Sequence, residues 1–387
     1  MSQPDTFAGA STGGHRTSER TFPFRAEHVG SFLRPPALLE ARARFQRGEI
    51  DAAQLRAAED EAIRDVVAMQ ERVGLETITD GEFRREYFHL DFLGQLGGVH
   101  TDSPGTVIGA DGKEHLVPPT IRVVDKVHHA RDIQRRDFEF LKGCTTRTPK
   151  VTIPSPTMLH FRAGRAGIDR ERYPDLEAFY QDVADAYVAE LHSLAEAGCT
   201  YVQLDDTNMA YLCDARMREA ARERGDDPDA LPFLYAHKFI NPVAERKPPG
   251  MILGMHVCRG NFKSTWAAQG GYEPVAEALL SEMKLDAYFL EYDDERSGDF
   301  GPLRHLPKGD KVVVLGLLTT KSGDLEEKDR IKRRIEEATR HVPLEQLALS
   351  PQCGFASTVH GNELDFAQQS RKLELVVDIA RDIWGDS

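Results

Sequence analysis

Four residues whose side chains are typical zinc ligands stand at the ends of short apolar segments. They are His256, Cys258, Glu291 and Cys353. Alternate side chains of an extended chain point the same way, so His256 and Cys258 can face one site. If the fold gathers these segment ends at one rim, the four side chains form a four-ligand zinc site.

The charges of this ligand set favour one use of the metal ion. Two thiolates and one carboxylate make the site electron-rich, which suits the activation of a thiol better than the activation of water. A thiol bound to zinc has a lowered pKa and stays a nucleophilic thiolate near neutral pH. Four protein ligands are also typical of a structural site. A zinc-stabilised binding module without turnover therefore stays open.

Eight short β-rich segments alternate with helical patterns along the chain, as in a parallel α/β fold. The expected strands are 25–30, 77–80, 150–153, 201–204, 251–256, 287–291, 311–315 and 346–349. Apolar residues three and four apart predict helices over 51–73, 175–197, 274–283, 326–339 and 363–383. Eight such units favour a (β/α)8 barrel, in which functional residues lie at the carboxyl ends of the strands.

Two stretches do not follow this alternation of strands and helices. Residues 95–147 are rich in Gly, Val, Thr and charge, and they predict an inserted β-hairpin region between the second and third strands. Residues 1–21 are rich in Ser, Thr, Gly and charge without a long apolar run, and they predict a disordered tail. The rest of the chain, 22–387, is expected to form a single barrel.

The composition of the chain limits the classes of partner and the cellular compartment that we expect. The 387-residue chain has a net charge of −14, which argues against nucleic acid as a partner. It has no apolar run long enough for a membrane span. Its five cysteines are an odd number at wide spacing, which argues against a disulfide framework and favours the reducing cytoplasm. The oligomeric state stays open.

Six short motifs give the sequence a family resemblance. They are HVGSF, TDGEFRR, QLDD, HVC, FLEYD and SPQCG. Together they resemble the cobalamin-independent methionine synthase family, in its C-terminal catalytic barrel and in shorter stand-alone homologues that lack the N-terminal barrel. The resemblance runs from about Arg25 to Trp384. It implies a zinc ion on the four ligands named above, homocysteine as the thiol, and a methyl-folate or other methyl donor.

The resemblance also implies a homocysteine-binding set, namely Ser31, Glu82 and Asp205. The residue types agree with this role, because Ser31 and nearby backbone N–H groups can hold an α-carboxylate. Glu82 and Asp205 can hold an α-ammonium. Other roles stay open: Ser31 as a helix N-cap, and ion pairs of Glu82 or Asp205 with Arg84 or Arg85.

The methyl-donor half of the family pattern is less complete here. Lys321 lies near the position where the family has a catalytic histidine. We expect it to act as an acid or as a contact for an anion. The alternative is that Lys321 is a surface residue without a role in the reaction. The family's pterin-stacking tryptophan has no match, and His160 or Phe161 is the expected substitute.

Two further functions compete with methionine formation. A related alkyl transferase would add another thiol, such as coenzyme M, to an epoxide, and such a substrate would not need Glu82 and Asp205. The non-catalytic zinc-stabilised module would bind no thiol at all.

Overall fold

The structure is a computed structural model that describes residues 22–102, 105–108, 114–117, 120–161, 163–261, 264, 266–356 and 361–385. The predicted tail, 1–21, lies outside the described residues. Within them, no helix combines the length and the apolar character needed to cross a membrane.

Six parallel strands form the centre of the fold, and neighbours in the sequence are also neighbours in the sheet. They are almost entirely buried, and β11, with the sequence VVVLGLL, shows the continuous apolar run typical of a strand buried on both faces. In chain order they are β7 (Val151–Pro154), β8 (Tyr201–Asp206), β9 (Ile252–Val257), β10 (Ala287–Glu291), β11 (Val312–Leu318) and β12 (Leu347–Pro351). The parallel α/β sheet that the sequence predicts is therefore present, and its strands run close to the expected positions.

Shorter pairings extend this sheet at both edges. β1 (Thr77–Ile78) pairs in parallel with β6 (Thr148–Pro149), which leads directly into β7. At the other edge Ala26 forms a parallel bridge with Leu349 of β12. All eight predicted strand positions thus follow one another around the sheet. The first is reduced to a single bridge, although a strand was predicted over 25–30.

Side chains join the segment of Ala26 to β1, where no strand pairing is seen among the described residues. The Glu27 carboxylate accepts hydrogen bonds from Lys150 Nζ at 2.6 Å, from Tyr201 at 3.3 Å and from the Thr77 hydroxyl. The imidazole Nε2 of His28 lies 3.0 Å from the Thr77 carbonyl oxygen. These buried side-chain contacts connect the first two strand positions at a junction that we call the seam.

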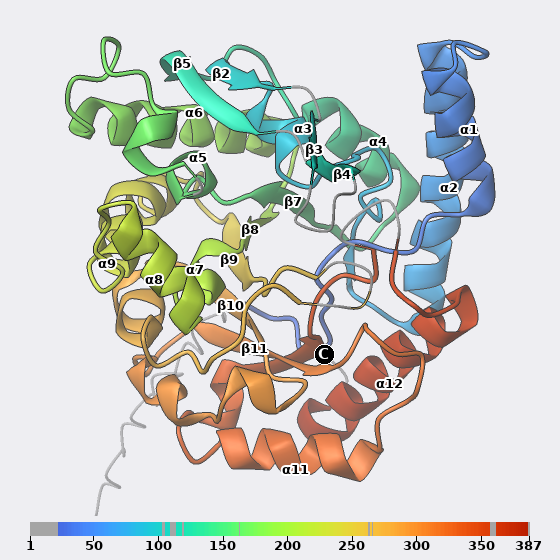
Figure 1. Cartoon of the computed structure of the whole chain (residues 1–387). Coiled ribbons are helices and arrows are strands. Elements are labelled where there is room, and N and C mark those ends of the chain that lie inside the picture. The colour runs from blue at the N-terminus through green and yellow to red at the C-terminus, as the bar shows by residue number, and fades with distance from the viewer. Residues whose placement is uncertain are drawn as a thin grey trace, which may run out of the picture.

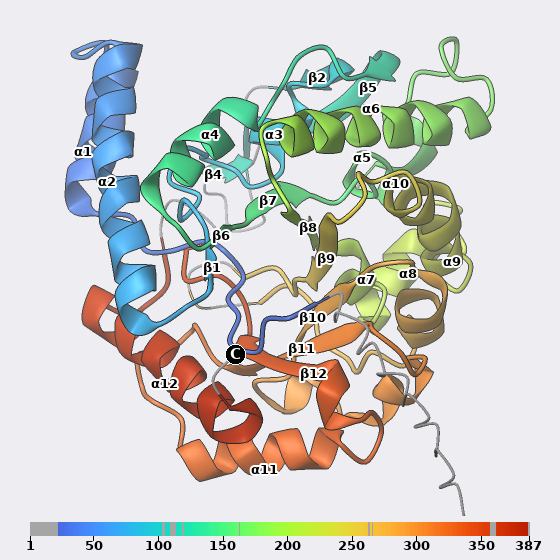
Figure 2. The same cartoon turned by 180° about the vertical axis from the view of Figure 1, so that it is seen from behind.

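Helices lie outside the strands, as Figures 1 and 2 show from opposite sides. Four of them match predicted helices: α2 (Ala52–Val73), α6 (Glu177–Glu196), α11 (Lys328–Ala338) and α12 (Phe366–Trp384). α2 begins where Asp51 and Gln54 form a reciprocal capping box, and it ends at Gly74 with a φ of 97°. The segment predicted as a helix over 274–283 forms a π-helix, η3 (Glu277–Glu282), instead of a regular α-helix.

Other helices were not predicted. α1 (Pro36–Gln46) packs along α2, and a group of short helices connects β8 to β9. That group contains α7 (Asn208–Tyr211), α8 (Ala215–Glu223), α9 (Leu231–Tyr235), η2 (Ala236–Ile240) and α10 (Asn241–Ala244). Short helical turns also follow β7 and β10, namely α5 (Met158–Phe161), η1 (Gly164–Gly167), η4 (Glu295–Ser297) and η5 (Gly301–His305), and η6 (Leu344–Gln346) precedes β12.

The stretch between β1 and β6 contains both antiparallel strands and helices. β2 (Gly97–Thr101) pairs with β5 (Ile121–His128), and β3 (Gly105–Ile108) pairs with β4 (Glu114–Val117). The short helix α3 (Leu90–Leu93) precedes them, and α4 (Arg135–Cys144) follows them. The sequence prediction for 95–147 included hairpin strands but missed α4, which buries only Phe138 and Leu141 and so shows no apolar repeat over successive turns.

Candidate functional site

The four predicted metal ligands lie together at the carboxyl ends of neighbouring strands. His256 belongs to β9 and Cys258 follows it, Glu291 ends β10, and Cys353 follows β12. Their ligand atoms all lie within 4.8 Å of one another. The Sγ atoms of Cys258 and Cys353 are 3.6 Å apart. Parallel strands bring their carboxyl ends to one edge, so residues almost a hundred positions apart can share a site.

The surroundings of these side chains fit a bound divalent cation. His256 is buried, yet neither ring nitrogen contacts a nitrogen or oxygen partner among the described residues. The contact with Cys258 and then burial raise the pKa of the Cys353 thiol well above its usual range. A cation between the two sulfur atoms would stabilise both thiolates. The mixture of imidazole, thiolates and carboxylate is the donor set that zinc accepts.

Glu291 is held by donors on both of its carboxylate oxygens. The backbone N–H of Arg259 donates to Oε1 at 2.8 Å, and Arg296 approaches Oε2 at 3.2 Å. The Glu291 backbone N–H donates to the Tyr272 hydroxyl at 2.9 Å, which fixes the end of β10. The backbone donor at Oε1 can set the direction of a ligating carboxylate, while Oε2 faces the Arg296 guanidinium.

Ser31 lies against the segment that carries Cys353. Its carbonyl oxygen accepts a hydrogen bond from Phe355 at 2.9 Å. A methyl group added at Gly354 would come within 1.8 Å of the Ser31 hydroxyl, so only glycine permits this approach. Ser31 is not a helix N-cap, because α1 begins at Pro36 and its N-cap is Pro35. The serine predicted to bind substrate is therefore beside the metal-ligand set.

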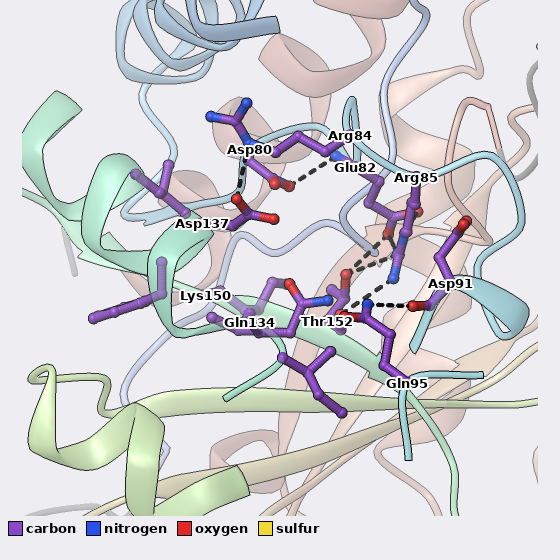
Figure 3. Close-up of a pocket in the computed structure, with 14 residues that line it drawn as sticks. Asp80, Glu82, Arg84, Arg85, Asp91, Gln95, Gln134, Asp137, Lys150 and Thr152 are labelled. Atoms are coloured by element: carbon purple, nitrogen blue, oxygen red, sulfur yellow. Dashed lines mark hydrogen bonds and ion pairs between the residues drawn. The ribbon is translucent and has the colours of Figure 1, made fainter. Parts of the chain in front are cut away.

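Glu82 and Asp205 approach the same guanidinium, that of Arg85. Arg85 Nε donates to Glu82 at 3.0 Å, and a second nitrogen pairs with the other Glu82 oxygen. That second nitrogen lies 3.6 Å from Asp205, and it also donates to Thr152 at 2.8 Å. Figure 3 shows Glu82, Arg85 and Thr152 in this arrangement. Of the two arginines left open as partners by the sequence, Arg85 pairs with both carboxylates, while Arg84 pairs with others.

The backbone of the chain places this carboxylate pair near the metal ligands. Asp205 is in register with His256 across β8 and β9. Glu82 has a φ of 62°, which is uncommon for a residue other than glycine and is found mainly where structure around it enforces it. Burial and then the charge of Glu82 raise the pKa of Asp205 to about 6, and Arg85 opposes this rise.

A cavity of about 180 Å³ is lined by Glu82 and Arg85 and by residues of α3 and α4. Figure 3 shows its charged lining, which includes Asp80, Arg84, Asp137 and Lys150. None of the four metal ligands lines it, and neither does Ser31 or Asp205. We therefore place the candidate site on the convergence of the ligating side chains and not in this cavity.

Lys321 is not a free surface residue. Its ammonium pairs with Asp293 at 2.8 Å, and its side chain is only 11% exposed. Asp293 also contacts Arg296 at 2.9 Å, and Arg296 contacts Glu291. Lys321 is thus linked to the metal-ligand set through two charged side chains, Asp293 and Arg296. His160 and Phe161, the expected pterin contacts, pack in the aromatic core beside Tyr235.

Three residues of the site were not singled out from the sequence. Arg85 was considered only as an alternative ion-pair partner, and Asp293 and Arg296 were not considered. The signals were present in TDGEFRR and in EYDDER, where charged residues directly follow predicted strand ends. Loop side chains have no periodicity, so their direction could not be inferred from spacing.

Known proteins share this chain's sequence and fold over almost its whole length. The chain matches the family described as cobalamin-independent synthase, catalytic domain, over residues 24–382. It is 45% identical to the Bacillus subtilis protein named uncharacterized protein YxjH, over 99% of this chain and 100% of the relative. It is 26% identical to the methionine synthase of Pyrococcus abyssi, over 84% of each chain.

A solved structure agrees with these sequence matches. It is the putative vitamin-B12-independent methionine synthase from Listeria monocytogenes, which is 40% identical and superposes with a TM-score of 0.75. The alignment covers 94% of this chain and 99% of that chain. The match over nearly the entire chain shows that this protein belongs to the cobalamin-independent synthase catalytic-domain family, a family of methionine-synthase-type methyltransferases.

Proposed function

We propose that this protein is a zinc-dependent methyltransferase that converts homocysteine to methionine, with a methylated folate or another methyl carrier as donor. The observation that carries the proposal is the convergence of His256, Cys258, Glu291 and Cys353, whose ligand atoms lie within 4.8 Å of one another. Zinc held there would lower the pKa of the substrate thiol.

The protein groups around this set support an amino-acid substrate. Ser31 stands beside Cys353 and would hold the α-carboxylate of homocysteine together with nearby backbone N–H groups. Glu82 and Asp205 would hold the α-ammonium. In the transfer, a carbon–sulfur bond forms to the methyl group, and the bond from the methyl group to the donor breaks. The thiol proton leaves, and the donor's leaving atom takes up a proton, for which Lys321 is the proposed source.

A reducing compartment such as the cytoplasm is part of the proposal. The sulfur atoms of Cys258 and Cys353 are 3.6 Å apart, so a modest approach would let an oxidant join them as a disulfide. An oxidised pair could not ligate zinc, because the thiolate is the metal ligand.

The test is the formation of methionine by the zinc-loaded protein. Homocysteine is supplied with methylated folates of different glutamate length, and methionine is measured by mass spectrometry. We expect wild type to form methionine, and Cys353→Ser to lose both stoichiometric zinc and turnover. Cys144→Ser is the matched control, because Cys144 is half-buried and lies at the end of α4.

Two results would overturn the proposal. One is full zinc content and full turnover in Cys353→Ser. The other is zinc-loaded wild type that forms no methionine with any methyl carrier but alkylates coenzyme M with an epoxide.

A further inference from the structure

A chain of buried charges connects Glu291 to Lys321. Arg296 NH2 lies 3.2 Å from Glu291 Oε2 and 2.9 Å from Asp293 Oδ1. The other Asp293 oxygen is 2.8 Å from Lys321 Nζ. The side chains of Glu291, Asp293 and Arg296 are at most 6% exposed. Interactions between such groups are weakly screened by salt and solvent.

Arg296 is anchored independently of Glu291. Its NH1 donates to Asp294 at 2.6 Å, and its guanidinium lies over the Trp266 ring with 4.7 Å to the ring centroid. Asp294 also caps the helical turn η4, in which Arg296 lies, by accepting from the Arg296 backbone N–H. The guanidinium would therefore keep its place if the Glu291 carboxylate moved.

Glu291 is the ligand of the set that an incoming thiol would replace most easily. A carboxylate is a hard ligand among softer thiolates, and a substrate thiolate competes best for a soft position. After the thiolate has replaced it on the metal, the Glu291 carboxylate would still be buried and negatively charged. An uncompensated buried charge is strongly unfavourable, so this exchange needs a cation that receives the carboxylate.

We propose that Arg296 is the positioning residue that receives the Glu291 carboxylate when the substrate thiol takes its place on the metal. Arg296 already contacts Glu291 Oε2, so a small movement of the carboxylate strengthens an existing ion pair. The Arg259 backbone N–H, which donates to Oε1 at 2.8 Å, supports the same carboxylate. This inference rests on the proposed function, because it requires a thiol substrate.

Asp293 and Lys321 then set the charge of Arg296's surroundings. Asp293 shares the same Arg296 nitrogen with Glu291, and Lys321 balances the charge of Asp293. Asp294 also pairs with Arg296, but its side chain is 44% exposed, so solvent screens its charge more than that of the buried Asp293. With Asp293 balanced by Lys321, Arg296 retains attraction for Glu291. The chain of contacts gives Lys321 a role in the site that does not depend on direct contact with a ligand.

The experiment compares wild type with Arg296→Gln and Arg296→Lys. Zinc affinity is measured by competition with a chromophoric chelator. The zinc shell is measured by X-ray absorption, with homocysteine titrated from zero to saturation. Arg304→Gln is the control, because Arg304 is an exposed arginine of the following turn that pairs with Glu273. Thermal unfolding of each variant confirms that it is folded.

We expect wild type to gain one sulfur neighbour and lose one oxygen neighbour on addition of homocysteine. Arg296→Gln should retain zinc with undiminished affinity but need about tenfold more homocysteine for the same change, as for the loss of one charge-assisted hydrogen bond. Arg296→Lys keeps the charge and should recover part of the effect. Arg304→Gln should match wild type.

The outcomes separate the two proposals. A wild-type zinc shell that does not change with homocysteine contradicts the proposed function itself. A wild-type shell that changes, with the same homocysteine dependence in Arg296→Gln, overturns the role of Arg296 alone. A loss of zinc affinity in Arg296→Gln without homocysteine also overturns it, because Arg296 would then orient Glu291 for metal binding and not receive it after exchange.

Discussion

At the scale of single residues, the charges around Arg85 match a ligand with one positive charge. Glu82 and Asp205 bring two carboxylates to one guanidinium, so the group carries a net negative charge when all three are ionised. Arg85 holds Glu82 through both carboxylate oxygens and is also fixed by Thr152. A substrate ammonium would stabilise the net negative charge of this buried group. Homocysteine carries an ammonium, whereas coenzyme M does not.

The change Glu82→Gln tests this match, because it keeps the shape of the side chain and removes its charge. We expect the KM for homocysteine to rise about tenfold to a hundredfold, as for the loss of a hydrogen bond to a charged group, with a smaller effect on kcat. Steady-state methionine formation gives both constants. Glu61→Gln, on the exposed face of α2, should behave as wild type. An unchanged KM would favour the epoxide-type reaction, whose thiol has no α-ammonium.

The residue scale also shows what the sequence could and could not predict about the site. His256, Cys258, Glu291 and Cys353 were predictable because each stands at a strand end, and parallel strands bring those ends together. Arg296 was not, because its position depends on how the loop after β10 turns back onto Glu291. A loop of this kind has no repeating pattern from which to infer a direction.

At the scale of secondary-structure elements, a buried ion pair lies at the first strand position. Glu27 and Lys150 are both fully buried, and their contact joins the segment before β1 to β7. The Lys150 ammonium also lies 5.1 Å and 5.3 Å from the centroids of the Phe289 and Tyr201 rings. The strand predicted over 25–30 was reduced to one bridge at Ala26, and side-chain contacts replace backbone pairing at this seam.

The change Lys150→Met should destabilise the fold by ~3–5 kcal/mol, because it leaves the Glu27 carboxylate buried without a cation. Urea unfolding followed by circular dichroism measures this free energy. The double change of Glu27→Gln with Lys150→Met should cost less than the single change, because it removes both charges. If the single change were neutral, the seam would not depend on this ion pair.

Predictability differed among the helices for physical reasons. α2, α6, α11 and α12 each bury three or more apolar residues at helical spacing. α1 and α4 are about as long as α11 but bury only two apolar residues each, and the helices between β8 and β9 are too short for such a repeat. The π-helix η3 keeps helical spacing of its apolar residues, so the sequence could not distinguish it from an α-helix.

At the scale of the whole molecule, the proposed metal ligands lie at the ends of strands that pair with one another through their backbones. β9, β10, β11 and β12 are joined by continuous parallel pairing. Alternate apolar side chains of these strands belong to a core that also includes residues of α6, α11 and α12, and the others form a separate buried cluster with Phe22 and Tyr201. A protein of this size buries enough apolar surface to fold without a metal, unlike small zinc domains.

Removal of zinc with a chelator should therefore abolish methionine formation while the chain stays folded. We expect a single cooperative thermal transition at a lower Tm, because zinc bound only to the folded state adds to stability. Turnover should return when zinc is added back. Circular dichroism and a methionine assay on the same samples separate the two effects. Unfolding of the chelated protein would instead favour a structural zinc site, since ligands needed for folding could not be released to a substrate thiol.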